Sequence, residues 1–223
     1  MLKVIAAKAR EQGIVVSEVA RPKLDAIAQS GNHQGVIALC PAKEYVGVDD
    51  ILAAAAEKGQ LPFVVVLDGI TDPHNMGAIL RTAEAGGVHG VIIPKRRAVG
   101  LTGAVAKTSA GAIEHVPVAK VTNISRTIED LKKAGLWIVC GGSGNPEETR
   151  EATLSGTSIY DTDLKGPVAL VIGAEGSGVS RLVREKADFV VHIPMFGHIG
   201  SLNASVAAGI MIYEVVRTRT LDR

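Results

Sequence analysis

Short, continuous apolar runs recur along the chain between stretches with helical periodicity, and this alternation constrains the fold more than any other feature. The runs are rich in Val and Ile and are not interrupted by alternating polar residues, which is typical of strands in a sheet covered on both faces. Stretches such as NMGAILRTAEAGG and ISRTIEDLKKAG have the spacing of amphipathic helices. The pattern predicts an α/β fold built on a parallel sheet, with strands at 63–68, 91–94, 136–141, 167–173 and 189–194.

The first 45 residues differ from the rest of the chain. A strand-like IVVSEV, a helix-like RPKLDAIAQ and a strand-like GVIALC predict a small α/β piece over residues 1–45. Residues 46–61 are predicted to be a linker with a helix over 50–58, followed by Gly59 and Pro62. Residues 62–223 form the predicted main domain. So short a front piece buries little apolar surface alone and is expected to need the larger domain or a partner.

Composition excludes several classes of protein. The 24 basic and 23 acidic residues give a net charge of +1, so the chain lacks the global basic footprint of a nucleic-acid binder. On charge alone, a neutral metabolic enzyme is the first expectation. Cys40 and Cys140 are too few for a disulfide framework, and neither the cysteines nor the scattered histidines have metal-ligand spacing. The sequence therefore predicts a cytoplasmic protein without a metal site.

Two segments bear on membrane association. The apolar stretch at the start is cut by Lys8, Arg10 and Glu11, so it does not resemble a signal peptide. The segment 189–213 has no charged residue and is long enough to cross a bilayer. Its polar groups and helix breaks, such as Pro194 and Asn203, would be costly in lipid. The prediction is buried protein interior and no membrane partner.

The first candidate site follows the predicted strand at 63–68. Functional groups in open α/β sheets gather beyond the carboxyl ends of strands. In LDGITDPHNMGAILRTAEAGG, Asp72 or Asn75 can cap the helix and Pro73 helps to fix the turn. Arg81 lies well inside this helix. A pair with Glu84 on the next turn is the structural alternative to a functional role for Arg81.

Glycine-rich turns follow two later strands. In VIGAEGSGVSRL, the turn before a helix opened by Ser180 exposes backbone N–H groups, which suits a nucleotide or a carboxylate, although a simple tight turn is the alternative. It does not match the dinucleotide-binding fingerprint. In VVHIPMFGHIGSLNASVAAGIMIYE, a strand ends at Pro194 and Ser201 is predicted to open a helix of small residues. Core packing does not explain Asn203, a polar amide in the predicted first turn of that helix.

The strings DPHNMGAILRTAEAGG, GAEGSGVS and IPMFGHIGSLNASVAAGI closely resemble, in this order, the three motifs of the SpoU branch of the SPOUT RNA methyltransferases. The resemblance covers about residues 62–217. The front part, through HQGVIALCPAKEY, resembles the end of the ribosomal-protein-like RNA-binding domain of the 23S rRNA guanosine 2'-O-methyltransferases. That domain is usually longer, so its first elements are expected to be missing here.

The resemblance implies a parallel sheet whose C-terminal part is tied in a deep trefoil knot, one of the rare exceptions to unknotted folds. It also implies a homodimer and S-adenosyl-L-methionine as cofactor. The residues that match the family's cofactor-binding positions are Gly141, Gly173, Ile193 and Leu202, with Gly142 nearby. Those that match its catalytic positions are Arg81, Asn75, Glu175, Ser201 and Asn203.

The resemblance implies that Arg81 is the central catalytic residue, and in some members of the family the base that removes the hydroxyl proton. A guanidinium is effectively always protonated in proteins. We therefore favour Arg81 as a cationic clamp on a neighbouring phosphate that stabilises the developing alkoxide, with the proton passing to phosphate or water. A neutral Arg81 and His74 as a local base are the alternatives.

The expected function is S-adenosylmethionine-dependent methylation of a ribose 2'-hydroxyl in RNA, most specifically at a guanosine of 23S rRNA. A tRNA methyltransferase is the alternative within the family. A nucleotide-binding oxidoreductase is disfavoured, because the chain lacks the dinucleotide-binding fingerprint. A non-enzymatic RNA-binding module would keep basic residues such as Lys95, Arg96 and Arg97 without needing Arg81 and its polar neighbours. The three basic residues could also be merely a solvated loop.

The charge is not evenly distributed along the chain. Residues 61–120 hold six basic and four acidic residues, so a local, modestly positive surface could bind RNA although the total charge is balanced.

Overall fold

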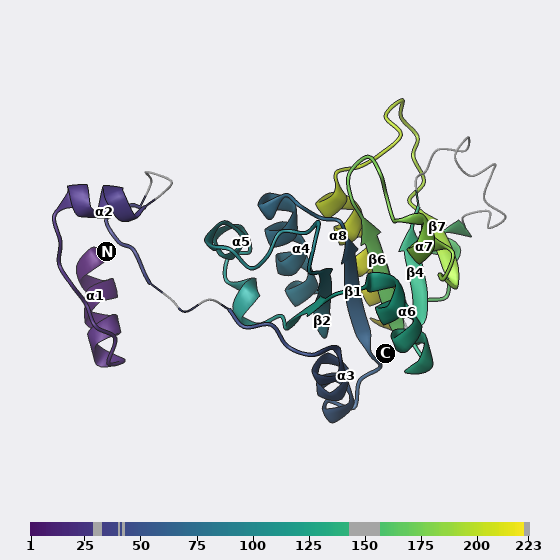
Figure 1. The fold of residues 1–223 in the computed structure, drawn as a ribbon, viewed down its shortest axis with the longest axis horizontal. Coiled ribbons are helices and arrows are strands. Elements are labelled where there is room, and N and C mark those ends of the chain that lie inside the picture. Colours follow the sequence, from purple (N-terminus) through teal and green to yellow (C-terminus); the bar gives the residue numbers. More distant parts are fainter. Residues whose placement is uncertain (29–32, 40, 42, 143–156, 221–223) are drawn as a thin grey trace. The chain divides into compact units, whose positions relative to one another are not determined.

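The structure, a computed structural model, describes all residues except 29–32, 40, 42, 143–156 and 221–223 (Figure 1). The chain divides into two compact units, Met1–Ala42 and Lys43–Arg223. Each unit is described by itself below.

The part of the small unit that the structure describes holds two helices, α1 (Leu2–Glu11) and α2 (Arg21–Ile27). The predicted helix over RPKLDAIAQ is confirmed as α2, with Pro22 in its first turn, where a missing N–H costs nothing. The predicted strands over IVVSEV and GVIALC are wrong, because the described residues of both runs form no strand. Val15 is 91% exposed and Leu39 is 85% exposed. Without a neighbouring strand to complete a ladder, β-branched residues alone do not make a sheet. Cys40, at the end of the second run, lies outside the described residues.

The described residues of the larger unit form a seven-stranded sheet with the order β3-β2-β1-β6-β4-β7-β5, and every neighbouring pair is parallel. The predicted parallel α/β sheet is thus confirmed. Two strands were not predicted, because VAKV carries a lysine and the other strand has two residues. The last predicted strand ends at His192, before Pro194. The strands are β1 (Phe63–Asp68), β2 (Gly90–Pro94), β3 (Val118–Val121), β4 (Trp137–Gly141), β5 (Thr157–Ser158), β6 (Val168–Gly173) and β7 (Phe189–His192).

Helices cover both faces of this sheet, as the continuous apolar strands require (Figure 1). Val65 and Leu67 of β1 pack into the cluster that includes α4, α5 and α8, whereas Val64 and Val66 pack with α3, α6 and α7. The helices are α3 (Val48–Glu57), α4 (Pro73–Ala85), α5 (Gly103–Thr108), α6 (Ile124–Lys133), α7 (Arg181–Arg184) and α8 (Ala204–Thr220), with short 3₁₀ turns η1 (Ala112–Glu114) and η2 (Ile159–Asp161).

The segment predicted as a linker, 46–61, contains α3. Ile51 and Ala55 of this helix are fully buried. A Cβ at Gly90 would lie 2.5 Å from the Ile51 side chain, so α3 packs directly on the start of β2. Val46 forms a parallel bridge with Ala119 of β3. These contacts place residues 46–57 in the packed body of the larger unit.

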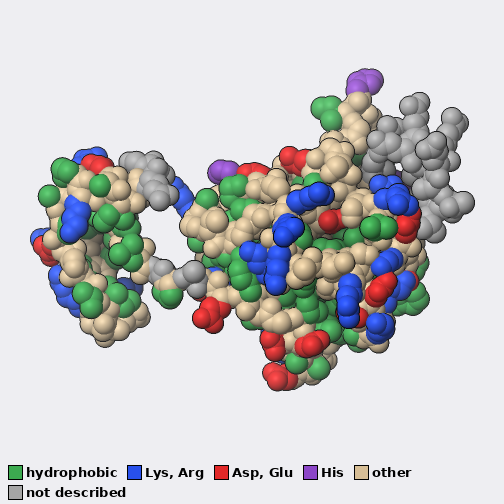
Figure 2. Space-filling model, in the orientation of Figure 1, with side chains coloured by type: hydrophobic (Ala, Val, Ile, Leu, Met, Phe, Trp, Pro, Cys, Tyr) green, Lys and Arg blue, Asp and Glu red, His purple; other side chains and the backbone are tan. Residues whose placement is uncertain are grey.

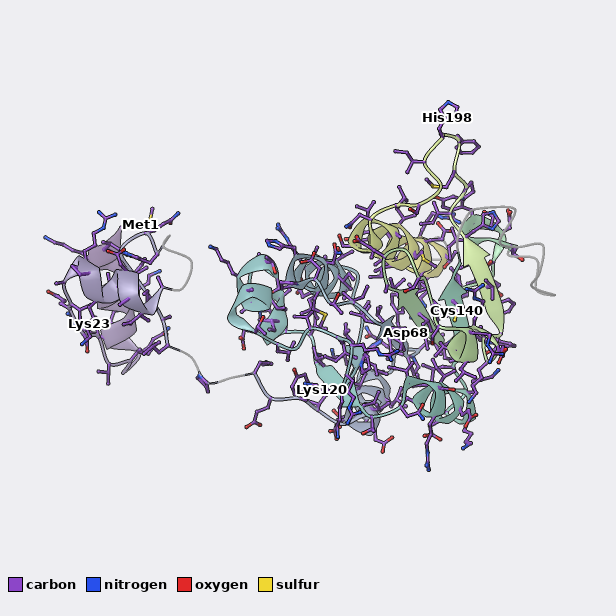
Figure 3. All side chains as sticks on the ribbon, turned by 45° about the horizontal axis from the view of Figure 1, so that its top comes forward. Met1, Lys23, Asp68, Lys120, Cys140 and His198 are labelled. Carbon is purple, nitrogen blue, oxygen red and sulfur yellow. The ribbon has the colours of Figure 1, made fainter. Side chains whose placement is uncertain are left out.

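The uncharged segment 189–213 is buried only in part. Val191 is fully buried, but Phe196 is 98% exposed and Ile199 is 74% exposed. They belong to a loop that projects from the unit, with His198 near its tip (Figure 3), and Figure 2 shows hydrophobic side chains and a histidine there. The prediction of buried interior is therefore wrong for this loop, because glycine-rich backbone between strand and helix lacks internal partners and lies at the surface. Among the described residues, no helix is long and apolar enough to cross a membrane. The trefoil knot remains a prediction.

Candidate active site

The first motif is fixed at the start of α4. Asp72 caps the helix by accepting hydrogen bonds from the backbone N–H groups of His74 and Asn75, each at 3.2 Å. Thr108 at the end of α5 donates its hydroxyl to the carbonyl of Pro73 at 3.0 Å. A Cβ at Gly77 would lie 2.0 Å from Thr108 Oγ1, so glycine permits this close packing. The buried Asn75 is therefore held in the first turn of a rigid helix.

The second motif is a tight turn after β6. Ala174 and Gly178 exchange two backbone hydrogen bonds, at 3.1 and 2.9 Å. A Cβ at Gly173 would lie 2.1 Å from the carbonyl carbon of Gly178, so no larger residue fits there. Asp68, at the end of β1, accepts a hydrogen bond from the backbone N–H of Ser180 at 2.8 Å. The turn is thus fastened to the strand that leads into the first motif. Ser180 precedes a helix of only four residues, α7.

The third motif places Asn203 immediately before α8. Its Oδ1 accepts hydrogen bonds from the backbone N–H groups of Ser205 at 3.0 Å and Val206 at 3.4 Å. The predicted helix start at Ser201 is wrong, because α8 begins at Ala204 and Ser201 lies in the preceding loop. Asn203 is therefore the residue that caps α8 and is not a member of its first turn. The cap is the position at which an asparagine stabilises a helix best.

The three motifs converge in one hydrogen-bonded network. Asn75 Nδ2 donates to Glu175 Oε1 at 3.1 Å. Asn203 Nδ2 donates to Asn75 Oδ1 at 2.9 Å and to Glu175 Oε1 at 2.5 Å. The backbone N–H of Ala204 reaches the same carboxylate oxygen at 3.3 Å. Three of the predicted catalytic residues, contributed by α4, the β6–α7 turn and the start of α8, therefore lie together.

A pocket of about 560 Å³ lies beside this network, beyond the carboxyl ends of β4, β6 and β7. All four predicted cofactor-binding residues line it, as do Glu175, Ser201 and Asn203. The members of the lining are Gly141, Gly142, Ile172, Gly173, Ala174, Glu175, Gly176, Gly178, Val191, Ile193, Met195, Gly200, Ser201, Leu202, Asn203, Ala204, Ala207 and Met211. The structure thus brings seven predicted site residues to one cavity.

Arg81 stands apart from this cavity. It lies six residues beyond Asn75, about 9 Å further along the axis of α4. Its side chain is exposed and does not line the pocket. Within the part of the chain that the structure describes, it has no hydrogen bond or ion pair, so the alternative pair with Glu84 is not formed. An exposed guanidinium in this state is available to an anion. His74 is also exposed, at the start of the same helix.

The pocket fits S-adenosylmethionine by size and chemistry. Its volume is in the range of small-molecule sites. Apolar side chains such as Ile193, Leu202 and Met211 can receive the adenosyl part, whereas the Glu175 carboxylate offers negative charge to a cationic ligand. Glycines leave backbone groups accessible on the pocket wall. Among the described residues, no group of three His, Cys, Asp or Glu side chains could hold a metal ion.

Cys140 precedes the pocket residue Gly141 in β4 but offers no nucleophile. Its side chain is fully buried in the larger unit (Figure 3). Burial, assisted by the Asp68 carboxylate, raises the pKa of the thiol to about 12. The thiol therefore stays protonated near neutral pH, and thiolates are the reactive form.

Sequence reasoning missed Asp68 and the pocket residues Met195 and Met211. Asp68 could have been recognised in the sequence, since it is the polar residue at the end of an otherwise apolar strand. The two methionines gave none, because a methionine in an apolar segment is usually core. Their role in the lining follows from the path of the chain alone.

Known proteins share both the sequence and the fold. Residues 62–213 match the model of the SpoU rRNA Methylase family, and residues 1–46 match the model described as RNA 2'-O ribose methyltransferase substrate binding. A protein of Bacillus subtilis strain 168, YacO, whose name assigns it to the TrmH family of tRNA/rRNA methyltransferases, is 52% identical over 211 residues. These residues are 95% of this chain and 80% of YacO.

Solved structures agree with this relationship. AviRb, a SpoU methyltransferase of Streptomyces viridochromogenes in complex with S-adenosylmethionine, has a TM-score of 0.64 and 30% identity, covering 80% of this chain and 66% of AviRb. An S-adenosylmethionine-bound rRNA methyltransferase of Sinorhizobium meliloti has a TM-score of 0.73 and 25% identity, covering 97% of this chain and 77% of its own. The chain therefore belongs to the SpoU family of S-adenosylmethionine-dependent RNA methyltransferases.

Proposed function

We propose that this chain methylates the 2'-hydroxyl of a guanosine in 23S rRNA, working as a cytoplasmic homodimer. The observation that carries the proposal is the convergence of Asn75, Glu175 and Asn203 beside the pocket lined by Gly173. A cofactor pocket alone would suit many enzymes. The network adds polar groups at the pocket's rim, where a ribose hydroxyl could be oriented.

The choice of rRNA rests on the front unit. The S. meliloti protein, named an rRNA methyltransferase, resembles 97% of this chain. The A. aeolicus protein named a TrmH/SpoU tRNA modifying enzyme resembles 73% of it, with a TM-score of 0.62. tRNA is thus the second candidate, because the likeness to that enzyme, at 30% identity, is also close.

In this proposal the glycine-lined part of the pocket, with Gly141, Gly173, Ile193 and Leu202, holds the cofactor mainly through backbone groups. When bound, S-adenosylmethionine supplies an electrophilic methyl group for the ribose oxygen. The trefoil knot that we propose for the C-terminal part of the sheet would explain why the C-terminal segments meet so closely here.

The polar residues have separate roles. Asn75, Ser201 and Asn203 orient the hydroxyl, and Glu175 fixes both amides by accepting their N–H groups. Arg81, which is exposed and lies outside the pocket, holds the phosphate that adjoins the methylated ribose, and through this contact its charge stabilises negative charge that develops on the ribose oxygen. The hydroxyl proton then leaves to that phosphate or to water. Placement in one rigid network reduces the entropy cost of aligning the reacting groups.

Homodimer formation is supported by exposed apolar side chains on the projecting loop and on α8. Phe196 and Ile199 extend from the loop, and Val206 and Tyr213 are half exposed on the helix. Apolar groups gathered in this way mark interaction surfaces. Sedimentation equilibrium gives twice the chain mass if this proposal holds.

The function is tested by calorimetry with S-adenosylhomocysteine and by methyl transfer to in vitro transcripts. Binding of S-adenosylhomocysteine together with 2'-O-methylation of 23S rRNA, mapped to a guanosine, supports the proposal. Methylation of a tRNA transcript alone moves the target to tRNA. If S-adenosylhomocysteine does not bind while RNA does, the chain is a binding module, and NAD binding would indicate an oxidoreductase.

A further inference from the structure

We infer that Lys95, Arg96, Arg97 and Lys120 form a phosphate-binding surface, the basic strip, that holds substrate RNA outside the catalytic pocket. The inference rests on the proposed RNA methylation and adds where the RNA backbone runs. Five observations support it.

The strip lies at the same edge of the sheet as the active site. Lys95 to Arg97 follow the carboxyl end of β2, and β2 is separated from β6 by β1 alone. Strands lie about 4.8 Å apart, so the ends of β2 and β6 are about 10 Å from each other. The backbone N–H of Val99 donates to the carbonyl of Ile70 at 2.9 Å, which fastens this loop to the one that precedes α4. A strand of RNA entering the pocket can therefore reach the strip.

The positive charge of the strip is not compensated. The three side chains after β2 are exposed, and among the described residues none makes an ion pair or side-chain hydrogen bond. By contrast, the cations Lys132 and Lys133 of α6 pair with Asp188 at 2.7 Å and Asp130 at 3.1 Å.

Three acidic side chains in the segments that precede α4 and β3 have partners outside the strip. Asp68 accepts a hydrogen bond from Ser180, Asp72 caps α4, and Glu114 pairs with Lys43 at 3.4 Å. Among the described residues, none of these carboxylates forms an ion pair with a cation of the strip, which leaves the cations available to phosphates.

Lys120 joins the strip through Tyr45. Its Nζ lies 4.9 Å from the centroid of the Tyr45 ring, and a Cβ at Gly100 would lie 3.9 Å from the same nitrogen. The Tyr45 hydroxyl accepts a hydrogen bond from the backbone N–H of Leu101 at 3.0 Å. Tyr45 thus fixes both the lysine and the end of the basic loop, so that the four cations belong to one surface. Figure 3 shows Lys120 at the margin of the larger unit.

Arg97 supplies a further indication. Its φ of 58° lies in the left-handed region, which residues other than glycine, asparagine and aspartate seldom adopt. A surface loop without a functional constraint would favour glycine, asparagine or aspartate at this position. Holding an arginine there keeps three consecutive cations on the loop.

The test compares the full chain with the strip variant Lys95→Gln/Arg96→Gln/Arg97→Asn, in which asparagine tolerates the backbone of position 97. The control Lys58→Gln/Arg126→Gln/Lys133→Gln removes the same charge at exposed positions elsewhere on the unit. RNA binding is measured by fluorescence anisotropy with a labelled single-stranded fragment of 23S rRNA over a range of salt concentrations. S-adenosylhomocysteine binding is measured by calorimetry on the same preparations.

We expect all three proteins to bind S-adenosylhomocysteine equally. The strip variant should bind RNA more weakly, with a slope of log affinity against log salt that is shallower by about 2, since each lost phosphate contact on single-stranded RNA removes about 0.7. With a 23S rRNA transcript, its KM should rise while kcat at saturating RNA is retained. An unchanged affinity and slope, or an equal loss in the control, would overturn the inference. Failure of the wild-type chain to bind S-adenosylhomocysteine would instead overturn the proposed function.

Discussion

Asn203 donates its side-chain amide to Glu175 Oε1 at 2.5 Å, while its amide oxygen caps α8. One side chain thus serves both the stability of a helix and the geometry of the proposed site. Because its second amide proton goes to Asn75 Oδ1, both polar atoms of the Asn203 side chain have partners. The orientation of the amide is therefore fixed by its surroundings.

Asn203→Asp separates these two roles. Aspartate caps a helix as well as asparagine does, but it removes both donors and sets a second carboxylate against Glu175. We expect a loss of about 1–3 kcal/mol in the free energy of unfolding and loss of methyl transfer, because hydrogen-bonded groups are left unpaired. Urea unfolding and a methylation assay measure the two effects. Ser205→Ala is the control, since it leaves the network bonds to Asn75 and Glu175 in place. Wild-type activity in Asn203→Asp would contradict the role of the network.

Arg81→Ala should abolish methyl transfer and leave S-adenosylhomocysteine binding nearly unchanged, because Arg81 does not line the pocket. Arg81→Lys keeps the charge but loses the planar fork, so partial activity is expected. Single-turnover methylation and calorimetry give the two readouts. If Arg81→Ala still turns over and His74→Ala does not, the base is His74 and the two assignments must be exchanged.

Gly173→Ala should disrupt the turn of the second motif. Its Cβ would meet the backbone of Gly178 at 2.1 Å and of Val179 at 2.2 Å, and backbone cannot rotate away as a side chain can. We expect a lower Tm and loss of S-adenosylhomocysteine binding. Gly103→Ala is the matched control, because a Cβ there meets nothing within 4 Å. Equal Tm values for the two variants would show that the turn adapts.

Stability should fall as the pH drops below the ordinary pKa of histidine. Burial, with Lys58 and Arg219 nearby, lowers the pKa of His89 from 6.5. His89 Nδ1 accepts a hydrogen bond from the backbone N–H of Phe63 at 3.1 Å, which needs the neutral ring. Below about pH 6.5 the unfolded chain binds a proton that the folded protein resists, so unfolding is favoured.

His89→Leu tests this origin of the pH dependence. Thermal unfolding between about pH 8 and about pH 5.5 should show a smaller fall in Tm for His89→Leu than for the wild type. The variant is expected to be less stable at the higher pH, because the Phe63 N–H loses its partner. An unchanged dependence on pH would assign it to other groups.

RNA binding by the wild-type chain should depend only weakly on salt. The net charge is +1, and the proposed phosphate contacts are the four cations of the basic strip and Arg81. At about 0.7 per phosphate contact, the slope of log affinity against log salt should be no steeper than about −3.5. Anisotropy titrations at several salt concentrations measure it. A much steeper slope would show that further basic residues contact the RNA.

Local sequence patterns were sufficient for much of the fold. Continuous apolar runs predicted five strands, since a buried parallel strand must be apolar on both faces. The sequence left either Asp72 or Asn75 as the cap of α4, and the structure shows that the cap is Asp72. The same reasoning failed for IVVSEV and GVIALC, where β-propensity had no neighbouring strand to act on.

The sequence by itself determined the parallel α/β sheet, the glycine turns and the family to which the chain belongs, because periodicity, caps and motif strings are local. Only the tertiary structure decided that Asn75 meets Glu175 and Asn203, which are 100 and 128 positions away. It also decided that Arg81 has no partner among the described residues and that the Phe196 loop is exposed. Contacts between distant residues depend on how the strands are ordered in the sheet, and no local pattern encodes that order.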